Sequence, residues 1–275
     1  MNGPERYDRL VLPFVHPFTR SLLRSVQVPS RASILDHGSG TGEVALALHR
    51  RWPDARIVAL DPDRLMLERL QEKAGVPPWL TVHEGHLHSG LDLGPFDLCV
   101  SQLALVFVHD PRTELAMLRR ITRPGGRLAV IVLREAAGMV PFFVFWTATR
   151  QVVPGAIAPE DYPHHRFAEG HALGAVAKEA GWDQVSVVPL AAERVCGEAT
   201  LWRWLSTTLP VRLNTGDTVD LRSDARVAAA VRRALGQLVE PYRSGDSYYL
   251  PTGTWLLTAI ARQSPHHKTS DCGPR

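Results

Sequence analysis

The stretch ILDHGSGTG, from Ile34 to Gly42, constrains this chain most, because a short apolar strand runs directly into three closely spaced glycines. A helix-like segment at 43–51 follows, and the next apolar strand, at 56–61, ends in Asp61. At the carboxyl edge of a parallel sheet, glycines let the backbone approach a ligand, and the next helix offers free N–H groups. A carboxylate at Asp61 can accept both hydroxyl hydrogens of a ribose. The combination predicts an α/β fold that binds a nucleoside.

The rest of the chain largely continues this alternation of apolar strands and amphipathic helices. It is typical of a doubly wound, mostly parallel sheet. Two segments depart from it: 138–153 is apolar and aromatic, and 191–254 is a long excursion, usually a lid or a functional insertion. We expect strands at 32–37, 56–61, 80–84, 96–101, 127–133, 184–190 and 255–262, and helices at 43–51, 63–74, 113–121, 168–180, 199–208 and 224–239.

The composition excludes several classes of function. Among 275 residues there are 31 Lys and Arg against 28 Asp and Glu, a formal net charge of +3 that favours neither nucleic acid nor a membrane surface as partner. Three widely spaced cysteines indicate neither a disulfide framework nor a zinc site. Without an apolar run for a signal peptide or a membrane span, we expect a cytoplasmic protein without stable membrane insertion. At 264–275 we expect a disordered tail.

The spacing of the glycines indicates which nucleoside binds. The dinucleotide pattern G-x-G-x-x-G is not met, because the third glycine comes one residue early and Glu43 stands in its place. Glu43 would sit poorly beside a pyrophosphate, and Asp36 suits an ammonium better than a phosphate. A ribose and a cationic amino-acid portion without phosphate describe S-adenosylmethionine, the cofactor we expect, with S-adenosylhomocysteine as its product. The alternative is a tight turn whose acids cap helices.

At these residues the chain resembles the class I S-adenosylmethionine-dependent methyltransferases, specifically the ubiquinone/menaquinone-type (methyltransferase type 11) small-molecule group. ILDHGSGTG resembles its first motif, VALDPDRLMLERL its second, FDLCVSQLALVFVHDP its fourth, and LRRITRPGGRLAVIV the helix-turn-strand that follows. The resemblance implies a Rossmann-like α/β fold: a seven-stranded, mostly parallel sheet with an antiparallel last strand, helices on both faces and a helical lid. It implies one methyltransferase domain over 1–263, with a cofactor-binding core at 30–135 and lid or substrate segments at 1–29, 138–170 and 191–254.

The resemblance also implies a set of cofactor-binding residues. The first motif would bind the amino-acid end, the acid after the second strand the ribose, and the following residues the adenine. The fourth motif would lie near the sulfonium and methionine portion, and the opening helix would close over the cofactor. In that order these residues are Asp36, Gly38, Ser39, Gly40 and Gly42; Asp61; Pro62, Met66, His86 and Leu87; and Ser101, Gln102 and Tyr7.

Three departures from the family pattern matter. The family usually has an acid where His86 stands, and either an unprotonated imidazole nitrogen or the loop backbone can accept the hydrogen bond of the adenine amino group instead. His37 replaces a small apolar residue of the first motif. Val106 and Phe107 occupy positions where the fourth motif often carries histidine, so a general base from that loop is missing.

Candidates for a general base lie elsewhere. Tyr162, His164 and His165 stand in a proline-rich loop, and His16 lies in the opening segment. We predict these four as catalytic, although solvent-exposed loop histidines are common.

A histidine pattern at 83, 86 and 88 raises the possibility of a metal site. No matching carboxylate or cysteine pattern accompanies it, so we predict none.

Methyl transfer from a sulfonium needs mainly a positioned acceptor and the exclusion of water. The apolar lid segments favour a hydrophobic small molecule, such as a quinone-like compound, a polyketide or another secondary metabolite, methylated on O, C or N. We therefore predict an S-adenosylmethionine-dependent methyltransferase, a monomer or homodimer that binds no nucleic acid. Two alternatives stay open: a cofactor-binding cyclase or isomerase of natural-product biosynthesis that does not methylate, and a cofactor-binding regulatory subunit.

Overall fold

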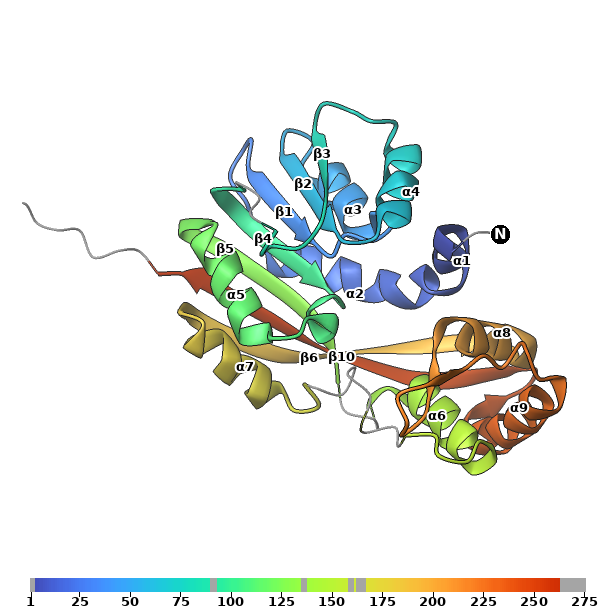
Figure 1. Ribbon diagram of the computed structural model, residues 1–275. Coiled ribbons are helices and arrows are strands. Elements are labelled where there is room, and N and C mark those ends of the chain that lie inside the picture. The colour runs from blue at the N-terminus through green and yellow to red at the C-terminus, as the bar shows by residue number, and fades with distance from the viewer. Residues whose placement is uncertain (1–2, 90–92, 135–137, 158–160, 162–166, 263–275) are drawn as a thin grey trace, which may run out of the picture.

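The computed structural model of the protein describes residues 3–89, 93–134, 138–157, 161 and 167–262. A central twisted sheet carries helices on both faces, and two long strands, β6 (Trp182–Cys196) and β10 (Ser247–Ala261), continue past it toward a separate group of helices (Figure 1). The expected tail at 264–275 and three of the predicted catalytic residues, Tyr162, His164 and His165, lie outside the described residues.

The main sheet has the strand order β3-β2-β1-β4-β5-β10-β6, and the short β9 pairs with β10 off this path. The pairs among β1 to β5 are parallel, whereas β10 runs antiparallel to both β5 and β6. This confirms the predicted Rossmann-like sheet with its antiparallel last strand. The remaining strands are β1 (Ser33–His37), β2 (Arg56–Asp61), β3 (Leu80–Glu84), β4 (Phe96–Gln102), β5 (Thr122–Leu133) and β9 (Arg243–Ser244).

Both faces of the sheet are buried, which is why its central strands are apolar at successive positions. Ile34 packs into the core on one face and its neighbour Leu35 into the core on the other. The first core includes residues of α2 (Leu12–Ser25), α3 (Glu43–Arg51) and α4 (Arg64–Ala74), and the second includes residues of α5 (Pro111–Arg120) and α7 (Gly170–Glu179). Each fully buried aliphatic side chain contributes about 1.5–3 kcal/mol, so these cores fix the two layers.

Aspartates define where two of the helices begin. The carboxylate of Asp63 accepts the backbone N–H groups of residues 65 and 66, at 2.9 and 3.4 Å, and starts α4. Asp110 accepts those of residues 112 and 113, at 3.0 and 3.3 Å, and starts α5. A cap of this kind contributes about 1 kcal/mol. The two caps hold the loops after β2 and β4 at the carboxyl edge of the sheet.

Three strands are longer than the sequence predicts. We expected strands at 127–133, 184–190 and 255–262, and the structure has β5 from Thr122, β6 over 15 residues and β10 over 15 residues. In β5, Thr122 pairs with Phe96 of β4 across a register shift, which accommodates the Pro-Gly-Gly stretch at 124–126. In β6 and β10 the extra residues pair mainly with each other, from Trp182–Ala261 to Cys196–Tyr248.

A helical lid, defined here as α6 (Val140–Val152), α8 (Glu198–Thr208) and α9 (Ala225–Val239), covers the far ends of β6 and β10 (Figure 1). The residues between α8 and α9 add a two-stranded sheet, β7 (Val211–Arg212) with β8 (Thr218–Val219), and a short turn, η5 (Glu240–Tyr242), follows α9. The N-terminal helix α1 (Gly3–Leu10) lies near α4 and faces the lid across the end of the sheet (Figure 1).

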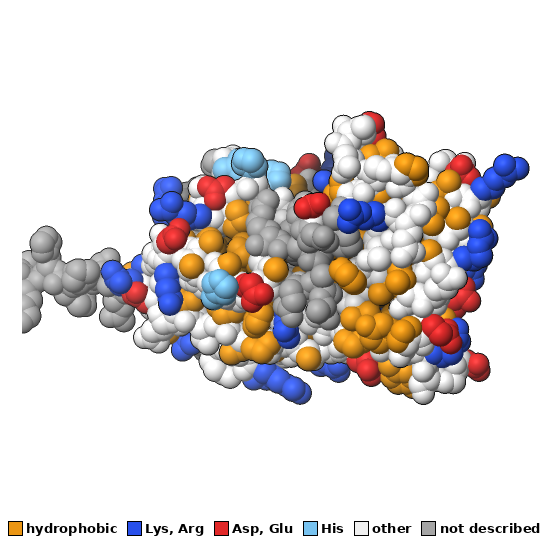
Figure 2. All heavy atoms as spheres, turned by 90° about the horizontal axis from the view of Figure 1, so that it is seen from below, with side chains coloured by type: hydrophobic (Ala, Val, Ile, Leu, Met, Phe, Trp, Pro, Cys, Tyr) orange, Lys and Arg blue, Asp and Glu red, His pale blue; other side chains and the backbone are white. Residues whose placement is uncertain are grey.

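Charged side chains of both signs are interspersed on the face shown in Figure 2. This distribution agrees with the small net charge of the chain. Among the described residues, no helix combines the length and the hydropathy that a membrane crossing requires.

Candidate functional site

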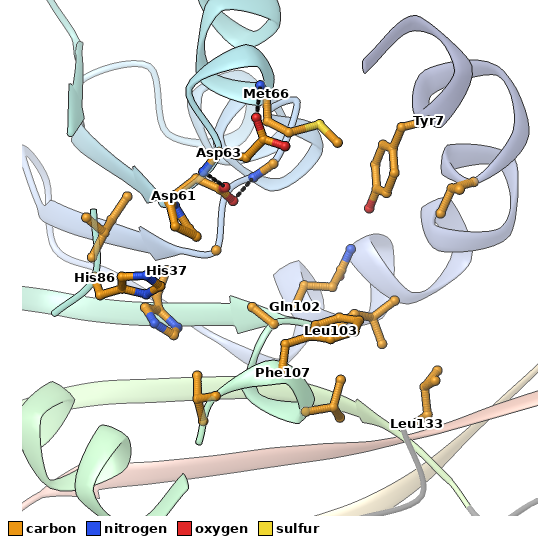
Figure 3. A pocket seen from close by; sticks show the side chains of 18 of the residues that line it. Tyr7, His37, Asp61, Asp63, Met66, His86, Gln102, Leu103, Phe107 and Leu133 are labelled. Carbon is orange, nitrogen blue, oxygen red and sulfur yellow. Dashed lines mark hydrogen bonds between the residues drawn. The ribbon is translucent and has the colours of Figure 1, made fainter. Parts of the chain in front are cut away.

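A cavity of about 1200 Å³ opens at the carboxyl edge of the sheet, where the predicted cofactor residues gather (Figure 3). Its walls come from the glycine loop, the residues after β2, β3 and β4, the N-terminal helices and the helical lid. Pockets for one drug-sized ligand span about 300–1,000 Å³. The cavity therefore has room for a cofactor together with a second molecule.

The three glycines of the loop serve different purposes. Gly38 has φ +71°, and a Cβ there would lie 2.1 Å from the Cβ of Ala104. At Gly42, with φ +85°, a Cβ would lie 2.1 Å from a methyl group of Leu70. Gly40 also has positive φ, +52°, but a Cβ there would meet nothing within 4 Å and the residue lines the cavity. Two glycines thus permit close packing within the protein, and Gly40 leaves its open side to a ligand.

Asp61 ties the glycine loop to the loop after β2. One oxygen of its carboxylate accepts the backbone N–H of Gly40 at 2.8 Å, and the other accepts that of Asp63 at 2.9 Å. The side chain is nearly buried yet lines the cavity (Figure 3). Both loops therefore hold this carboxylate in one orientation, and a carboxylate oxygen has lone pairs left for ligand hydroxyls.

Asp36 is a buried carboxylate with an unmet hydrogen bond. It is 1 % exposed, and its Oδ2 has no hydrogen-bond partner in the described part of the chain. Burial raises the pKa of Asp36 to about 7, against a lowering bond from the backbone of Ala45, and the carboxylates of Asp61 and Glu43 raise it further. The Oγ of Ser39 is also buried without a partner. An incoming cationic group would satisfy these acceptors and relieve the repulsion among the acids.

Tyr7 points from α1 into the cavity (Figure 3). Burial raises its pKa to about 12, and the carboxylate of Asp61 adds to the shift. The phenol is therefore protonated at neutral pH, so Tyr7 acts as a hydrogen-bond donor and not as a base.

The neighbouring Asp8 fastens α1 to the core. Its carboxylate accepts hydrogen bonds from Thr41 at 2.5 Å and Arg69 at 2.8 Å, and pairs with Lys73 at 3.1 Å. Partial burial raises the Asp8 pKa, but the bonds from these three residues outweigh it and hold the pKa below its usual value. One side chain thus joins the N-terminal helix to both α4 and the glycine loop.

His37, Ser101 and Glu114 form a buried polar cluster under the same end of the cavity as Asp61. The Nδ1 of His37 lies 3.1 Å from Ser101 Oγ, and its Nε2 lies 2.8 Å from Glu114 Oε1. All three residues are buried, and both His37 and Glu114 line the cavity. The cluster joins β1, β4 and α5.

The opposite end of the cavity is apolar and aromatic. Phe14 of α2, Phe142 of α6 and Trp204 of α8 meet with ring centroids 5.4–5.7 Å apart. Leu133 and Leu209 add to this wall. Since these residues come from the N-terminal helices, the sheet and the lid, this end exists only when the three parts are assembled.

The structure brings most of the predicted cofactor residues to one cavity. Eight of them line the cavity, including His86 from the loop after β3. Asp36, Ser39, Gly42, Leu87 and Ser101 stand behind this surface in the loop or the core. The lining residues are Tyr7, Gly38, Gly40, Asp61, Pro62, Met66, Gln102 and His86.

The predicted catalytic residue His16 is not among the lining residues. Its side chain is 51 % exposed, and its Nδ1 bonds Glu43 Oε1 at 2.5 Å. Its role stays a prediction, as do those of Tyr162, His164 and His165. The imidazoles of His86 and His88 stack at 4.9 Å. Among the described residues no group of three or more His, Cys, Asp and Glu is placed to hold a metal ion.

Sequence reasoning missed Phe14 and Glu114, which line the cavity from outside the motifs. Both lie on helices whose approach to the cavity depends on how the chain folds back. The unusual histidine at position 37 was the one available signal, because an imidazole on a buried strand requires a polar partner.

The residues present fit S-adenosylmethionine. The unpartnered oxygen of Asp36 suits its ammonium, the open face of Gly40 leaves space for its backbone, and Asp61 is fixed where a ribose would need acceptors. Gln102 lines the cavity beside them, with its Nε2 donating to Thr19 Oγ1 at 2.8 Å and its Oε1 buried without a partner.

Comparison with known proteins agrees with this site. Residues 35–130 match the family described as methyltransferase domain. The chain is 31% identical over 131 residues to a trans-aconitate 2-methyltransferase of Azoarcus sp. (strain BH72), covering 46% of this chain and 51% of that one. It is 33% identical over 186 residues to a malonyl-[acyl-carrier protein] O-methyltransferase of Halorhodospira halophila, covering 65% of this chain and 58% of that one. The chain thus spans little more than half the length of these curated relatives.

A solved structure shows the same architecture over the greater length of the chain. The YcgJ protein of Bacillus subtilis superposes with a TM-score of 0.60 at 14% identity, covering 90% of this chain and 100% of that one. At this identity the likeness concerns the fold. Residues 35–130 thus match a methyltransferase domain, and the chain has the Rossmann-like α/β fold of solved structures such as the YcgJ protein and a protein of Bacillus halodurans that is named as a methyltransferase.

Proposed function

We propose that this protein is an S-adenosylmethionine-dependent methyltransferase that acts on a small molecule with a hydrophobic body. The observation that carries the proposal is the cradle of Asp36, Gly40 and Asp61, in which an open glycine and a doubly anchored carboxylate line the cavity and a buried acid with an unpartnered oxygen stands behind them. A cationic amino acid joined to a ribose satisfies all three.

The polar end of the cavity suits the cofactor, and the apolar end suits the methyl acceptor. When bound, S-adenosylmethionine supplies an electrophilic methyl group on a sulfonium. The protein's own residues would hold and orient the reactants: Asp36 the amino-acid end of the cofactor and Asp61 its ribose, while Tyr7 closes the cavity from α1. The aromatic wall of Phe14 and Trp204 would exclude water from the acceptor. Positioning of the reactants together with exclusion of water supplies most of the rate in displacements of this kind.

The chemical character of the acceptor wall supports a hydrophobic substrate. Phe142, Leu133 and Leu209 present hydrocarbon surface, and Thr207, Thr208 and Arg6 are polar residues that also line the cavity. The curated relatives act, by name, on trans-aconitate and on malonyl-[acyl-carrier protein]. Both of those molecules carry carboxylates, and Arg6 would suit an acidic group on an otherwise apolar acceptor. A quinone-like, polyketide or other secondary metabolite remains our proposed class.

Calorimetry with S-adenosylhomocysteine tests the first part of this proposal. Wild type should bind it with a micromolar or tighter dissociation constant, and Asp61→Ala should weaken binding at least about tenfold, because hydrogen bonds to a charged group contribute about 1.5–3 kcal/mol. Asp54→Ala is the matched control, since Asp54 is exposed and lies away from this cavity. Absence of binding to wild type would contradict the proposal.

Product mass tests the second part. With a panel of hydrophobic acceptors, a methyltransferase adds one CH₂ unit to the product and releases S-adenosylhomocysteine. A product of unchanged mass would instead identify a cyclase or isomerase, and binding without any turnover across the panel would identify a regulatory subunit.

A further inference from the structure

Among the polar groups of the cavity, the buried cluster of His37, Ser101 and Glu114 has no part in the mechanism above. Its composition resembles that of a nucleophilic triad, but its geometry does not serve one. Ser101 is fully buried, and it is the Nδ1 of His37 that faces it, while Nε2 faces the carboxylate. A nucleophile must be exposed to its substrate. The reactive end of the cluster is therefore Glu114, which lines the cavity.

The histidine fixes the orientation of that carboxylate. Since Nε2 of His37 lies 2.8 Å from Glu114 Oε1, it carries the proton and donates it, and Nδ1 accepts from the Ser101 hydroxyl. One oxygen of Glu114 is thereby engaged, and Oε2 is left as an acceptor.

Glu114 differs in this respect from the other carboxylates that line the cavity. Asp61 has both oxygens bonded by backbone N–H groups. Asp63 and Asp110 are exposed and cap the helices α4 and α5. Glu114 is buried, with His37 Nε2 as the hydrogen-bond partner of its Oε1. Among these four lining acids it is the one that combines burial with an oxygen left over.

The cluster lies at the nucleoside end of the cavity. His37 pairs in register with Leu60, the residue before Asp61, and with Ser101. Figure 3 places His37 and His86 together at the end that Asp61 occupies, away from Tyr7 and Leu133. A ligand with its ribose at Asp61 and its amino-acid end at Asp36 therefore has its base directed toward this end.

We propose that Glu114, held by His37, reads the exocyclic amino group of the cofactor's adenine and so selects a 6-amino purine over a 6-oxo purine. This inference rests on the proposed function, because it requires that the cavity binds S-adenosylmethionine. A carboxylate accepts from an N–H donor and repels a carbonyl oxygen. Glu114 is thus the specificity-determining residue for the base, and His37 is a positioning residue that acts through it.

The test compares S-adenosylhomocysteine with S-inosylhomocysteine, which carries an oxo group in place of the amino group, by calorimetry on the full chain. Wild type should prefer the adenosyl ligand by about 100-fold or more, as sites built around a hydrogen bond do. Glu114→Gln should narrow this ratio at least about tenfold, because the glutamine amide can turn its NH₂ toward the oxo group. Glu84→Gln is the matched control, since Glu84 is exposed and does not line the cavity.

The role of His37 has its own test. His37→Leu should narrow the ratio as well, because the carboxylate is no longer held, and His37→Gln, which keeps an N–H donor, should restore part of it. Because each ratio compares two ligands on the same protein, a loss of folded material does not affect it.

The outcomes separate this inference from the proposed function. If wild type binds neither ligand, the proposed function fails and this inference fails with it. If wild type prefers the adenosyl ligand and Glu114→Gln keeps the full ratio, only this inference is overturned. A collapse of the ratio in His86→Ala alone would overturn it in favour of the exposed imidazole.

Discussion

A single buried acid links the chemistry of the cavity to pH. The pKa of Asp36, raised to about 7 by burial, lies well above the value of about 3.9 in an unfolded chain. Between these values the folded protein holds a proton that the unfolded chain has lost, so the free energy of unfolding falls as pH rises from 4 to 7. Above pH 7 the free energy of unfolding is lower by the full amount, up to about 4 kcal/mol.

Asp36→Asn should remove this pH dependence. In urea denaturation of the ligand-free protein, the free energy of unfolding should differ less between pH 5 and pH 8 in the variant than in wild type. Binding of S-adenosylhomocysteine at pH 7 should release roughly half a proton from wild type, since the ligand ammonium favours the ionised acid, and none from the variant. Calorimetry in buffers of different ionisation enthalpy measures this release. Equal release from both proteins would show that the titrating group is not Asp36.

Gly38 and Gly40, two positions apart in the sequence, differ sharply in what an added methyl group would meet. Gly38→Ala places a Cβ 2.1 Å from Ala104, in addition to the strain of its positive φ, and should cost about 3 kcal/mol or more in stability. Gly40→Ala carries the strain alone, about 1 kcal/mol, but its methyl group projects into the ligand space and should weaken cofactor binding at least tenfold.

The control for this pair is Gly155→Ala, which has φ +76°, nothing within 4 Å of its Cβ and no place in the cavity wall. It should lose stability as Gly40→Ala does and keep cofactor binding. Denaturant titration and calorimetry on the three variants check both quantities. Unchanged cofactor affinity in Gly40→Ala would mean that the ligand does not pass this glycine.

At the scale of elements, α1 is joined to the core by the bonds of Asp8 with Thr41, Arg69 and Lys73. Asp8→Ala should release the helix, so cofactor affinity should fall about tenfold while the cores stay intact. Hydrogen exchange at residues 3–10 should accelerate without a change elsewhere. Glu72→Ala is the control, because Glu72 bonds Arg69 but does not touch α1. Similar effects of both variants would assign the effect to Arg69 instead.

Local sequence patterns predicted those elements whose burial alternates or is continuous over their whole length. The helix at 43–51 and the strands at 56–61 and 80–84 match the structure to the residue. Much of β6 alternates between half-buried and exposed positions and pairs with β10 beyond the core, so its outer half carries no apolar signature.

The same distinction applies to the site. The glycine loop and Asp61 were predictable because their spacing is local, whereas Glu114 and Phe14 reach the cavity from helices placed by long-range contacts. No property of the residues next to them in sequence marks either side chain as part of the site.

For the whole molecule, Trp204 connects the parts that surround the acceptor end. It is 1 % exposed and contacts Phe14 of α2 and Phe142 of α6. Trp204→Ala should cost about 3–5 kcal/mol and lower the melting temperature of the entire protein. Trp202→Ala, at a partly buried position on the same helix, is the control and should cost less. Circular dichroism measures the melting temperature of both variants. A loss of helical signal in Trp204→Ala that leaves the melting temperature unchanged would contradict this coupling.

The continuous pairing of β6 and β10 has a consequence for the entry and release of ligands. Their ladder runs from Trp182–Ala261 in the core to Cys196–Tyr248 beside the lid, so lifting the lid would break or bend a row of backbone hydrogen bonds. On the other side, α1 is fastened by the charged side chain of Asp8, whose attractions weaken as ions screen them. We therefore expect ligands to enter and leave more easily on the α1 side than on the lid side. The rates of entry and release should rise with ionic strength.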